Sequence, residues 1–264
     1  MLEVEHLTIQ SKNADKILSD VTLTISPGEC AGLTGSSGSG KTTLIKAILG
    51  MQGEGLSVTS GRIILDGSDL SRKSAKERRQ LCGKIFGFIP QNPMTAFFPH
   101  VRIGTQIEET FCRLTGVNRY TARILAANTL NQVNLDHVER IMSAYPGELS
   151  GGMLQRIAMA LILGTKPKYI LADEPTSALD EGNRNQLVEL LRCYQERAGI
   201  LFISHDAQAI KTLCPFTRVM EHGRIIETQP TEQLFISPIQ PWTKRFIEAA
   251  SKCEEVIWQW TALR

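Results

Sequence analysis

The sequence lacks the features that mark exported, membrane-spanning and strongly charged proteins. Its longest uncharged apolar run, residues 157–165, is shorter than the roughly 18 residues that a membrane-spanning helix needs. The N-terminus lacks the basic and apolar regions of a secretory signal. Basic and acidic residues nearly cancel, with 29 Lys and Arg against 27 Asp and Glu, so no overall basic field points to a nucleic acid. We therefore expect a soluble, unexported protein without a nucleic-acid partner.

Clustered cysteines and early aromatic residues are also missing. The six cysteines are scattered without a Cys-x-x-Cys pair, so neither a disulfide framework nor a structural zinc site is expected. We expect small apolar residues in a reducing compartment at Cys30, Cys82, Cys112, Cys193, Cys214 and Cys253. Phe86 is the first aromatic residue of the chain. With 264 residues and 42% apolar content, the chain can bury the core of one large domain or two small ones.

Short strands and one helix are predicted for the N-terminal part of the chain. Leu2, Val4, His6 and Thr8 alternate with the residues between them, which is typical of a strand. The further expected elements are a strand over 21–25, a doubly buried strand over 30–34, a helix over 42–49 ending at Gly50, a Gly/Ser/Thr-rich loop over 52–61 and a strand over 62–66.

A helical region interrupts this alternation of strands and helices. Ile103, Ile107, Phe111 and Leu114 recur at helical spacing within residues 102–142. The alternation then resumes with a strand over 169–172, a helix around 185–197 and a strand over 199–204. We therefore predict a helical segment inserted into an α/β core, followed by an appended helical tail from Thr231.

Residues 35–42 match the pattern G-x-x-x-x-G-K-[ST] between a predicted strand and a predicted helix, a context that a flexible Gly/Ser linker would not have. Glycines let successive backbone N–H groups point at phosphate oxygens, and the helix start adds its positive dipole end. Lys41 is expected to reach the β- and γ-phosphates, and the Thr42 hydroxyl to bind Mg²⁺. The predicted nucleotide-binding residues are Gly35, Ser36, Ser37, Gly38, Ser39, Gly40, Lys41, Thr42 and Thr43.

Two adjacent carboxylates, Asp173 and Glu174, follow the uncharged strand over 169–172. The carboxyl edge of a parallel sheet is where ligands of α/β proteins bind. Asp173 is suited to hold Mg²⁺ through water, and Glu174 to orient and deprotonate an attacking water, a role worth roughly 10²–10⁴-fold in rate. The pair alone would also fit a solvated acidic turn, but the phosphate-binding pattern upstream favours catalysis.

A third motif, Ser150-Gly151-Gly152, precedes an apolar helix over 157–163. Ser150 is a candidate N-cap, and the glycines expose backbone N–H groups at a helix start, which again suits an anion. An ordinary capped helix would share these features. The motif's position shortly before Asp173 favours a second anion-binding surface.

The three motifs together resemble the ATP-binding subunits of ABC transporters over about residues 1–230. Further positions then match conserved motifs of the family. Gln91 matches the Q-loop glutamine, which senses Mg²⁺ and water and connects to the membrane partner. Residues 177–180 match the D-loop, and His205 matches the switch histidine that contacts the γ-phosphate. The resemblance implies catalytic roles for Glu174, His205 and Gln91, Mg²⁺ binding by Thr42, Gln91 and Asp173, and nucleotide contacts by Ser150, Gly151, Gly152 and Asp180.

The resemblance also implies the fold class and the domain boundaries. We expect an α/β protein with a P-loop NTPase (RecA-like) core, an antiparallel β subdomain and an inserted α-helical subdomain. The core would comprise residues 1–91 and 166–230, and the helical subdomain with the signature motif residues 92–165. A C-terminal extension would span residues 231–264.

Family members act as motors that dimerise head-to-tail. Each ATP would lie between residues 35–42 of one subunit and residues 150–152 of the other. Both surfaces consist of N–H donors, so ATP with Mg²⁺ would supply the attraction between them, and hydrolysis would remove it. The implied partners are a second ATP-binding subunit, expected to be a related chain, two transmembrane permease subunits and an extracytoplasmic solute-binding protein. The chain would then lie peripherally on the cytoplasmic face of the cell membrane.

Two segments, residues 90–99 and Met153 to Arg156, resemble the peptide/nickel importer family. Residues 237–246 are similar to that family's C-terminal extension, although Gln240 and Trp242 are substituted. The short chain and the isolated Cys253 favour the nickel or metal-metallophore type over the dipeptide or oligopeptide type, which carries a longer, cysteine-clustered extension.

Two functions outside import are less consistent with the sequence. A soluble ABC ATPase of DNA repair or translation would carry coiled-coil or zinc insertions, or a second such domain. A P-loop kinase of another family would lack the motif at residues 150–153 and the switch histidine.

The chain departs from the family at the adenine site. Family members stack adenine on an aromatic side chain near the start of the chain, whereas residues 9–17 here offer only aliphatic or lysine-stem contacts. The missing stack should weaken ATP affinity by roughly 1–3 kcal/mol and reduce selectivity for adenine. Two interpretations stay open for Phe97, Phe98 and Phe111: a groove for the membrane partner, or the core of the helical subdomain.

Overall fold

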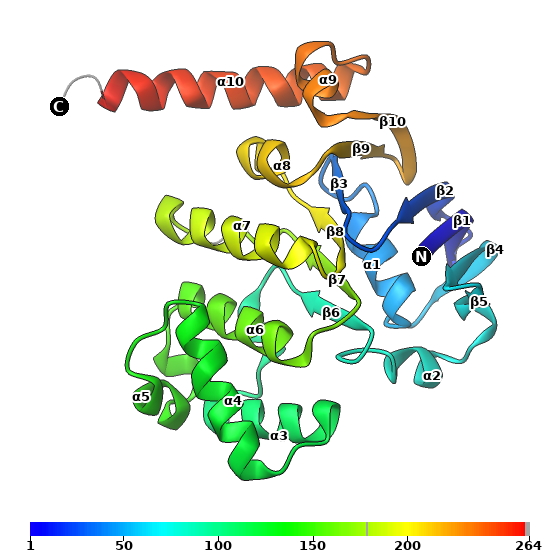
Figure 1. The fold of residues 1–264 in the computed structure, drawn as a ribbon. Coiled ribbons are helices and arrows are strands. Elements are labelled where there is room, and N and C mark those ends of the chain that lie inside the picture. The colour runs from blue at the N-terminus through cyan, green and yellow to red at the C-terminus, as the bar shows by residue number, and fades with distance from the viewer. Residues whose placement is uncertain (178, 262–264) are drawn as a thin grey trace.

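The chain forms two β-sheets that enclose helix α1 (Figure 1). The computed structural model describes residues 1–177 and 179–261, with the backbone alone described from residue 253. The smaller sheet is antiparallel, with the order β2-β1-β4-β5. Its strands are β1 (Leu2–Ser11), β2 (Lys16–Ile25), β4 (Leu56–Leu65) and β5 (Ser68–Asp69).

The larger sheet has the order β10-β9-β3-β8-β7-β6 and is parallel except for β10. Its strands are β3 (Cys30–Gly35), β6 (Phe86–Ile89), β7 (Tyr169–Asp173), β8 (Gly199–Ile203), β9 (Phe216–Glu221) and β10 (Arg224–Pro230). Adjacent side chains of β8 enter different cores: Leu201 and Ile203 pack on the α1 side, and Ile200 and Phe202 on the opposite side. This burial on both faces explains why the parallel strands are almost uncharged.

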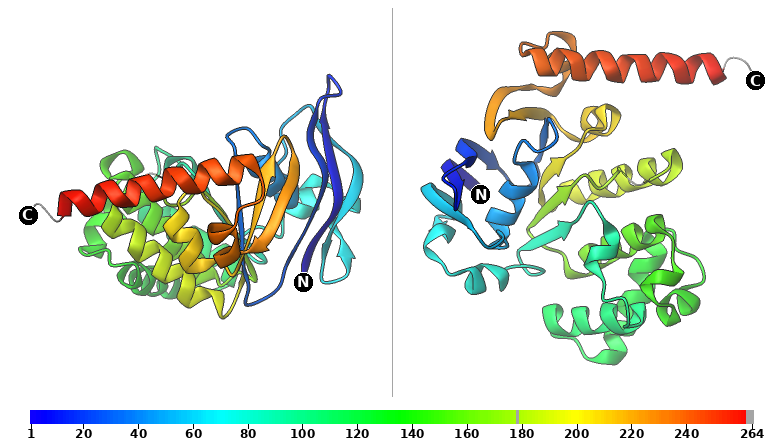
Figure 2. Two further views of the ribbon diagram at one scale, coloured as in Figure 1. Left: turned by 90° about the horizontal axis from the view of Figure 1, so that it is seen from above. Right: turned by 180° about the vertical axis from the view of Figure 1, so that it is seen from behind.

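Helices cover the larger sheet and fill the long connection between β6 and β7 (Figures 1 and 2). Their bounds are α1 (Lys41–Leu49), α2 (Ala75–Arg79), α3 (Ile103–Thr115), α4 (Arg119–Gln132), α5 (Val138–Ser143), α6 (Gly151–Thr165), α7 (Glu181–Gln195), α8 (Ala207–Leu213), α9 (Thr231–Ile236) and α10 (Pro241–Thr261). Among the described residues, no helix has the length and apolar character to cross a membrane. The fold is the α/β P-loop architecture that the sequence predicts.

The strand predicted around residues 2–8 is confirmed as β1, although its alternation is interrupted, whereas the loop predicted over 52–61 was wrong in part. His6 adopts a left-handed φ of 49°, and the pairing of β1 with both neighbours shifts register between residues 4 and 8. The buried face therefore continues through Leu7 and Ile9, not through His6 and Thr8. The predicted loop over 52–61 is strand from Leu56 onward. Gly61, at φ 86°, allows β4 to pack against the irregular part of β1 at His6, because a Cβ at this position would lie 2.4 Å from the His6 carbonyl oxygen.

The aromatic residues of the helical region divide between core and surface. Phe97 and Phe111 are buried, with Phe111 packed against Gly164 of α6, whereas Phe98 is 73% exposed. Within the described part of the chain, the thiols of Cys30 and Cys214 lie 3.6 Å apart in the core. The side chain of Cys253 and residue 178 of the predicted D-loop fall outside the described residues.

Replacing Phe111 by Ala should destabilise the protein by about 3–5 kcal/mol, because it leaves a cavity between α3 and α6. Denaturant unfolding gives this free energy. The control is Phe98→Ala, which should change stability by at most about 0.5 kcal/mol since the ring is largely in solvent. Equal losses in the two variants would contradict the assignment of Phe111 to the core.

Candidate nucleotide-binding site

The loop between β3 and α1 is held in a conformation that requires glycine. Gly35 ends β3 with φ 148°, and a Cβ there would lie 1.9 Å from the carbonyl oxygen of Met220 on the neighbouring strand β9. Gly40 is the N-cap of α1 with φ 103°. No side chain caps this helix end. The first N–H groups of α1 therefore remain available to an anion, as the predicted phosphate-binding loop requires.

The amine of Lys41 is directed back into this loop. Only 6% of the residue is exposed, and its Nζ donates hydrogen bonds to the carbonyl oxygens of Gly35 at 2.7 Å and Ser36 at 2.8 Å. Burial lowers the pKa of Lys41, while the negative charges of Glu174 and Asp173 act in the opposite direction. The result is a cation that is partly desolvated beside the helix start.

Asp173 and Glu174 occupy different environments at the end of β7. Asp173 is 4% exposed; burial raises its pKa, and a hydrogen bond from the Thr42 side chain opposes that shift. Glu174 has a left-handed φ of 47°. Its two carboxylate oxygens face Gln91 Nε2 and His205 Nε2, each at 3.1 Å. Glu174 is thus held between residues that follow β6 and β8, as parallel strand ends meeting at one sheet edge would place them.

His205 follows β8 and lies between a cation and a carboxylate. Burial and the positive charge of Lys41 lower the pKa of His205, while Glu174 raises it through its charge and its hydrogen bond. Since the lowering effects dominate, the imidazole stays neutral down to a pH below the ordinary pKa of histidine.

These groups surround one cavity of about 400 Å³. Most of the predicted nucleotide and catalytic residues line it, together with Ile17 at the start of β2. The lining residues are Ile17, Ser37, Gly38, Ser39, Gly40, Lys41, Thr42, Thr43, Gln91, Glu174 and His205. Ile17 belongs to the segment over residues 9–17 that offers aliphatic or lysine-stem contacts, and no local pattern shows which of those residues turns toward the loop.

The predicted nucleotide-binding residues at 150–152 and 180 lie apart from this cavity. Ser150 caps α6 by accepting a hydrogen bond from Met153 N at 3.2 Å, and Asp180 caps α7 by accepting one from Asn183 N at 2.9 Å. Neither these caps nor Gly151 and Gly152 line the cavity. Within one chain, the two predicted anion-binding surfaces are therefore not brought together.

The oxygen donors near the cavity suit a hard cation bound together with phosphate. Thr42, Asp173 and Gln91 supply a hydroxyl, a carboxylate and an amide oxygen, and Mg²⁺ commonly uses only one or two carboxylates beside phosphate and water. Among the side chains described, those of residues 1–177 and 179–252, no group of three or more His, Cys, Asp and Glu could hold a metal ion. The chemistry of this donor set fits Mg²⁺ that arrives with a nucleotide.

Sequence reasoning missed the supporting contacts behind the catalytic groups. The hydroxyls of Thr176 and Ser204 lie 3.4 Å apart and connect the segments that follow β7 and β8. Asp206 caps α8 and faces Arg184 of α7 at 3.4 Å. Their positions just after parallel strands are a signal that could have suggested them.

Comparisons with known proteins agree with this geometry. The sequence pattern of a family described as ABC transporter matches residues 18–177. The metal-staphylopine import system ATP-binding protein CntD of Staphylococcus aureus is 35% identical over 258 residues, which is 97% of this chain and 95% of the relative. The oligopeptide transport ATP-binding protein OppD of Lactococcus lactis is 32% identical over 263 residues, covering 97% of this chain and 77% of the relative.

Solved structures show the same fold. The ATP-binding cassette MJ0796, in a dimeric post-hydrolysis state bound to ADP and Pi, superimposes with a TM-score of 0.77 at 23% identity, covering 88% of this chain and 99% of that one. A second similar structure is cbiO1 from Clostridium perfringens, with a TM-score of 0.74, 25% identity and coverage of 89% and 90%.

The pKa of His205 should respond in opposite directions to its two charged neighbours. In the unmodified protein, the pKa of the imidazole should lie below the ordinary value for histidine, because the ring is buried and lies near the positive charge of Lys41. Glu174→Gln should lower the midpoint further by removing a stabilising negative charge, whereas Lys41→Met should raise it by removing a positive one. NMR titration of the imidazole carbon-bound protons measures all three midpoints. A rise in Glu174→Gln would contradict the proposed electrostatics.

Proposed function

Because the chain belongs to the ABC transporter family as one of its ATP-binding, ATP-hydrolysing subunits, we propose that it is the motor of an importer for nickel or for a metal chelate such as a metallophore complex. The observation that carries the catalytic assignment is the contact of Glu174 with both Gln91 and His205 at the edge of the cavity that Lys41 enters. This arrangement provides a base, a polar residue that orients it and an imidazole at one cavity of about 400 Å³.

In the proposed reaction, the backbone N–H groups of residues 35–42 and the Lys41 amine bind the β- and γ-phosphates. Glu174 orients and deprotonates the attacking water, and the His205 imidazole contacts the γ-phosphate. Thr42, Asp173 and Gln91 would hold Mg²⁺, which neutralises charge on the β- and γ-phosphate oxygens when bound. Gln91 connects this site to the membrane partner.

Pairing of two ATP-binding subunits would complete the site. Ser150, Gly151, Gly152 and Asp180 lie outside the cavity of their own chain. Gly151 and Gly152 present N–H groups at the start of α6, and the side chains of Ser150 and Asp180 cap the starts of α6 and α7. We propose that the partner subunit supplies these residues to the nucleotide. Both facing surfaces carry positive helix ends, so the negative charge of ATP is the attraction that brings them together.

The transported solute is proposed from sequence similarity. The metal-staphylopine relative matches this chain over nearly its full length, whereas the oligopeptide relative is longer than the match. A metal-chelate importer is therefore favoured, and a dipeptide or oligopeptide importer is the second candidate. In either case, we propose two permease subunits and an extracytoplasmic solute-binding protein as further components, with the chain on the cytoplasmic membrane face. ATPase stimulation by each solute in the reconstituted complex distinguishes the two candidates.

Glu174→Gln should lower ATP turnover by about 10²–10⁴-fold, because the amide cannot accept the proton of the attacking water. ATP binding should persist, and ATP-bound dimers should accumulate. Steady-state phosphate release and analytical ultracentrifugation measure the two effects. Glu189→Gln on the exposed face of α7 is the matched control and should keep full activity. Full turnover in Glu174→Gln would overturn the assignment of the base.

Ile17→Tyr should tighten ATP binding by about 1–3 kcal/mol, since it adds an aromatic platform where the cavity now has an aliphatic side chain. In the unmodified protein, we expect ATP and GTP affinities within about tenfold of each other, or about 1.4 kcal/mol. Isothermal titration with both nucleotides measures these values, and Ile17→Leu is the aliphatic control. Strong rejection of GTP by the unmodified protein would show that another adenine contact exists.

A further inference from the structure

The last helix is anchored to the larger sheet by one buried carboxylate. Glu227 on β10 is 6% exposed and accepts hydrogen bonds from the main-chain N–H groups of Ile239 and Gln240, at 2.8 and 3.0 Å. It also accepts one from the fully buried Thr243 hydroxyl at 2.6 Å. Burial disfavours the charge, but these hydrogen bonds hold the pKa of Glu227 below its ordinary value. The N-terminal end of α10 is therefore fixed to β10.

Aromatic packing fixes the direction in which α10 leaves this anchor. Trp242 and Phe246, one turn apart on α10, stack with ring centres 5.3 Å apart and planes at 10°. Phe246 also packs against Phe235 of α9 at 6.3 Å. From its anchored N-terminal end, α10 runs above α8 and α7 and extends past them (Figures 1 and 2).

The part of α10 that lies over α7 and α8 forms a groove with them, next to the catalytic groups. Ala250 of α10 forms one wall, and the other lining residues come from α7, α8 and the segments that precede them. The groove has a volume of about 810 Å³. Glu174 and His205 line both this groove and the nucleotide cavity, so the two spaces adjoin at the catalytic residues.

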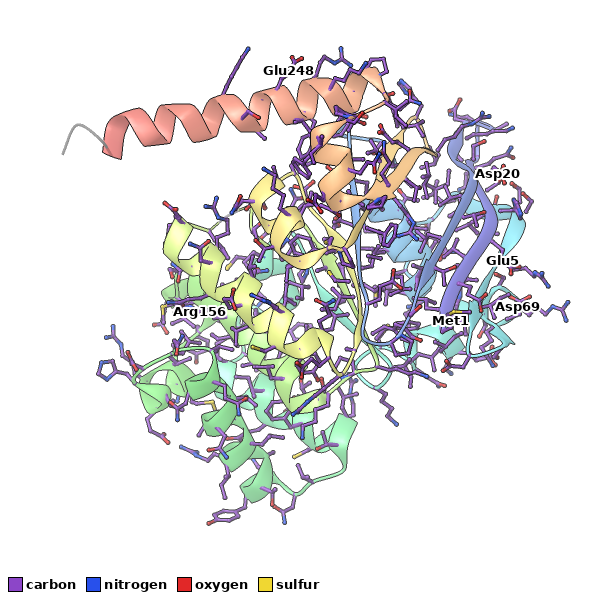
Figure 3. All side chains as sticks on the ribbon, turned by 45° about the horizontal axis from the view of Figure 1, so that its top comes forward. Met1, Glu5, Asp20, Asp69, Arg156 and Glu248 are labelled. Atoms are coloured by element: carbon purple, nitrogen blue, oxygen red, sulfur yellow. The ribbon has the colours of Figure 1, made fainter. Side chains whose placement is uncertain are left out.

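Because the groove and the nucleotide cavity share Glu174 and His205, a molecule that covers the cavity would also occupy the groove. The proposed function, on which this inference rests, places a second ATP-binding subunit over the nucleotide cavity. A surface that covers Glu174 and His205 at that cavity must also border the adjoining groove, whose floor includes Ser177 of the predicted D-loop. It would then meet α10. Figure 3 shows the length of α10 that projects beyond the rest of the chain, with Glu248 labelled on it.

We propose that α10 and the groove beneath it form part of the dimer interface, receiving a second copy of this fold when ATP is bound. The anchor at Glu227 holds α10 over the catalytic face, and the Ala250 side of the helix contacts the incoming subunit. The C-terminal extension thereby stabilises the closed dimer without touching the nucleotide.

Ala250→Arg in the hydrolysis-deficient Glu174→Gln background tests this interface. The arginine occupies the groove, so the ATP-dependent dimer should weaken by about tenfold in dissociation constant, about 1.4 kcal/mol. Sedimentation of the purified chain with Mg²⁺ and ATP measures the constant, with a second copy of the chain as the probe. Ala249→Arg introduces the same side chain at the neighbouring exposed position and should keep the parental constant.

A second pair of variants tests the anchor. Glu227→Gln replaces one acceptor oxygen by an amide donor facing N–H and O–H groups, so α10 should loosen and the dimer should weaken. Glu232→Gln on the exposed face of α9 is the control. ATP binding by the monomer should be unchanged in all four variants, which separates lost pairing from lost folding.

The outcomes separate this inference from the proposed function. If Ala250→Arg and Glu227→Gln dimerise as tightly as their parent, the role of α10 is overturned while the motor assignment stands. If the Glu174→Gln parent binds ATP and stays monomeric, the pairing of two copies of this chain fails, and the inference about α10 fails with it. Equal weakening by Ala250→Arg and Ala249→Arg would also overturn the groove as the contact.

Discussion

The site depends on the meeting of parallel strand ends at one edge of the larger sheet. β3 leads into the phosphate-binding loop, while the segments after β6, β7 and β8 supply Gln91, the carboxylate pair and His205. Because these strands are adjacent and parallel, their carboxyl ends bring residues distant in sequence within hydrogen-bond reach of Glu174. Burial is the largest cause of the pKa shifts of Lys41, Asp173 and His205, and the charges of the neighbouring groups modify each shift.

The insertion between β6 and β7 explains how one chain can carry two anion-binding surfaces that do not meet. The phosphate loop starts α1 against the sheet, whereas Ser150 starts α6 within the helical segment. Both helix starts attract negative charge, and neither attracts the other. A triphosphate between two chains therefore satisfies both surfaces, which gives a physical reason for ATP-dependent pairing in the proposed motor.

Regular elements were predicted well where burial on both faces or a cap left a local signal. The strand over 30–34 and the end of α1 at Gly50 are examples, since β3 is fully buried and Gly50 adopts φ 69°. The prediction was wrong over 56–61, which belongs to β4. There the irregular pairing of β1 and β4 depends on the close approach of Gly61 to the His6 backbone, a contact between strands that neither segment encodes by itself.

The sequence by itself determined the phosphate loop, the carboxylate pair and the family, because each rests on residue types at fixed spacing along a few adjacent positions. Only the tertiary structure decided that Glu174 contacts both Gln91 and His205, that Ile17 faces the cavity, and that α10 is fixed by Glu227 above the catalytic edge. These are contacts between segments far apart in the chain. Their geometry follows from strand order and from how helices pack on the sheet, which local spacing does not specify.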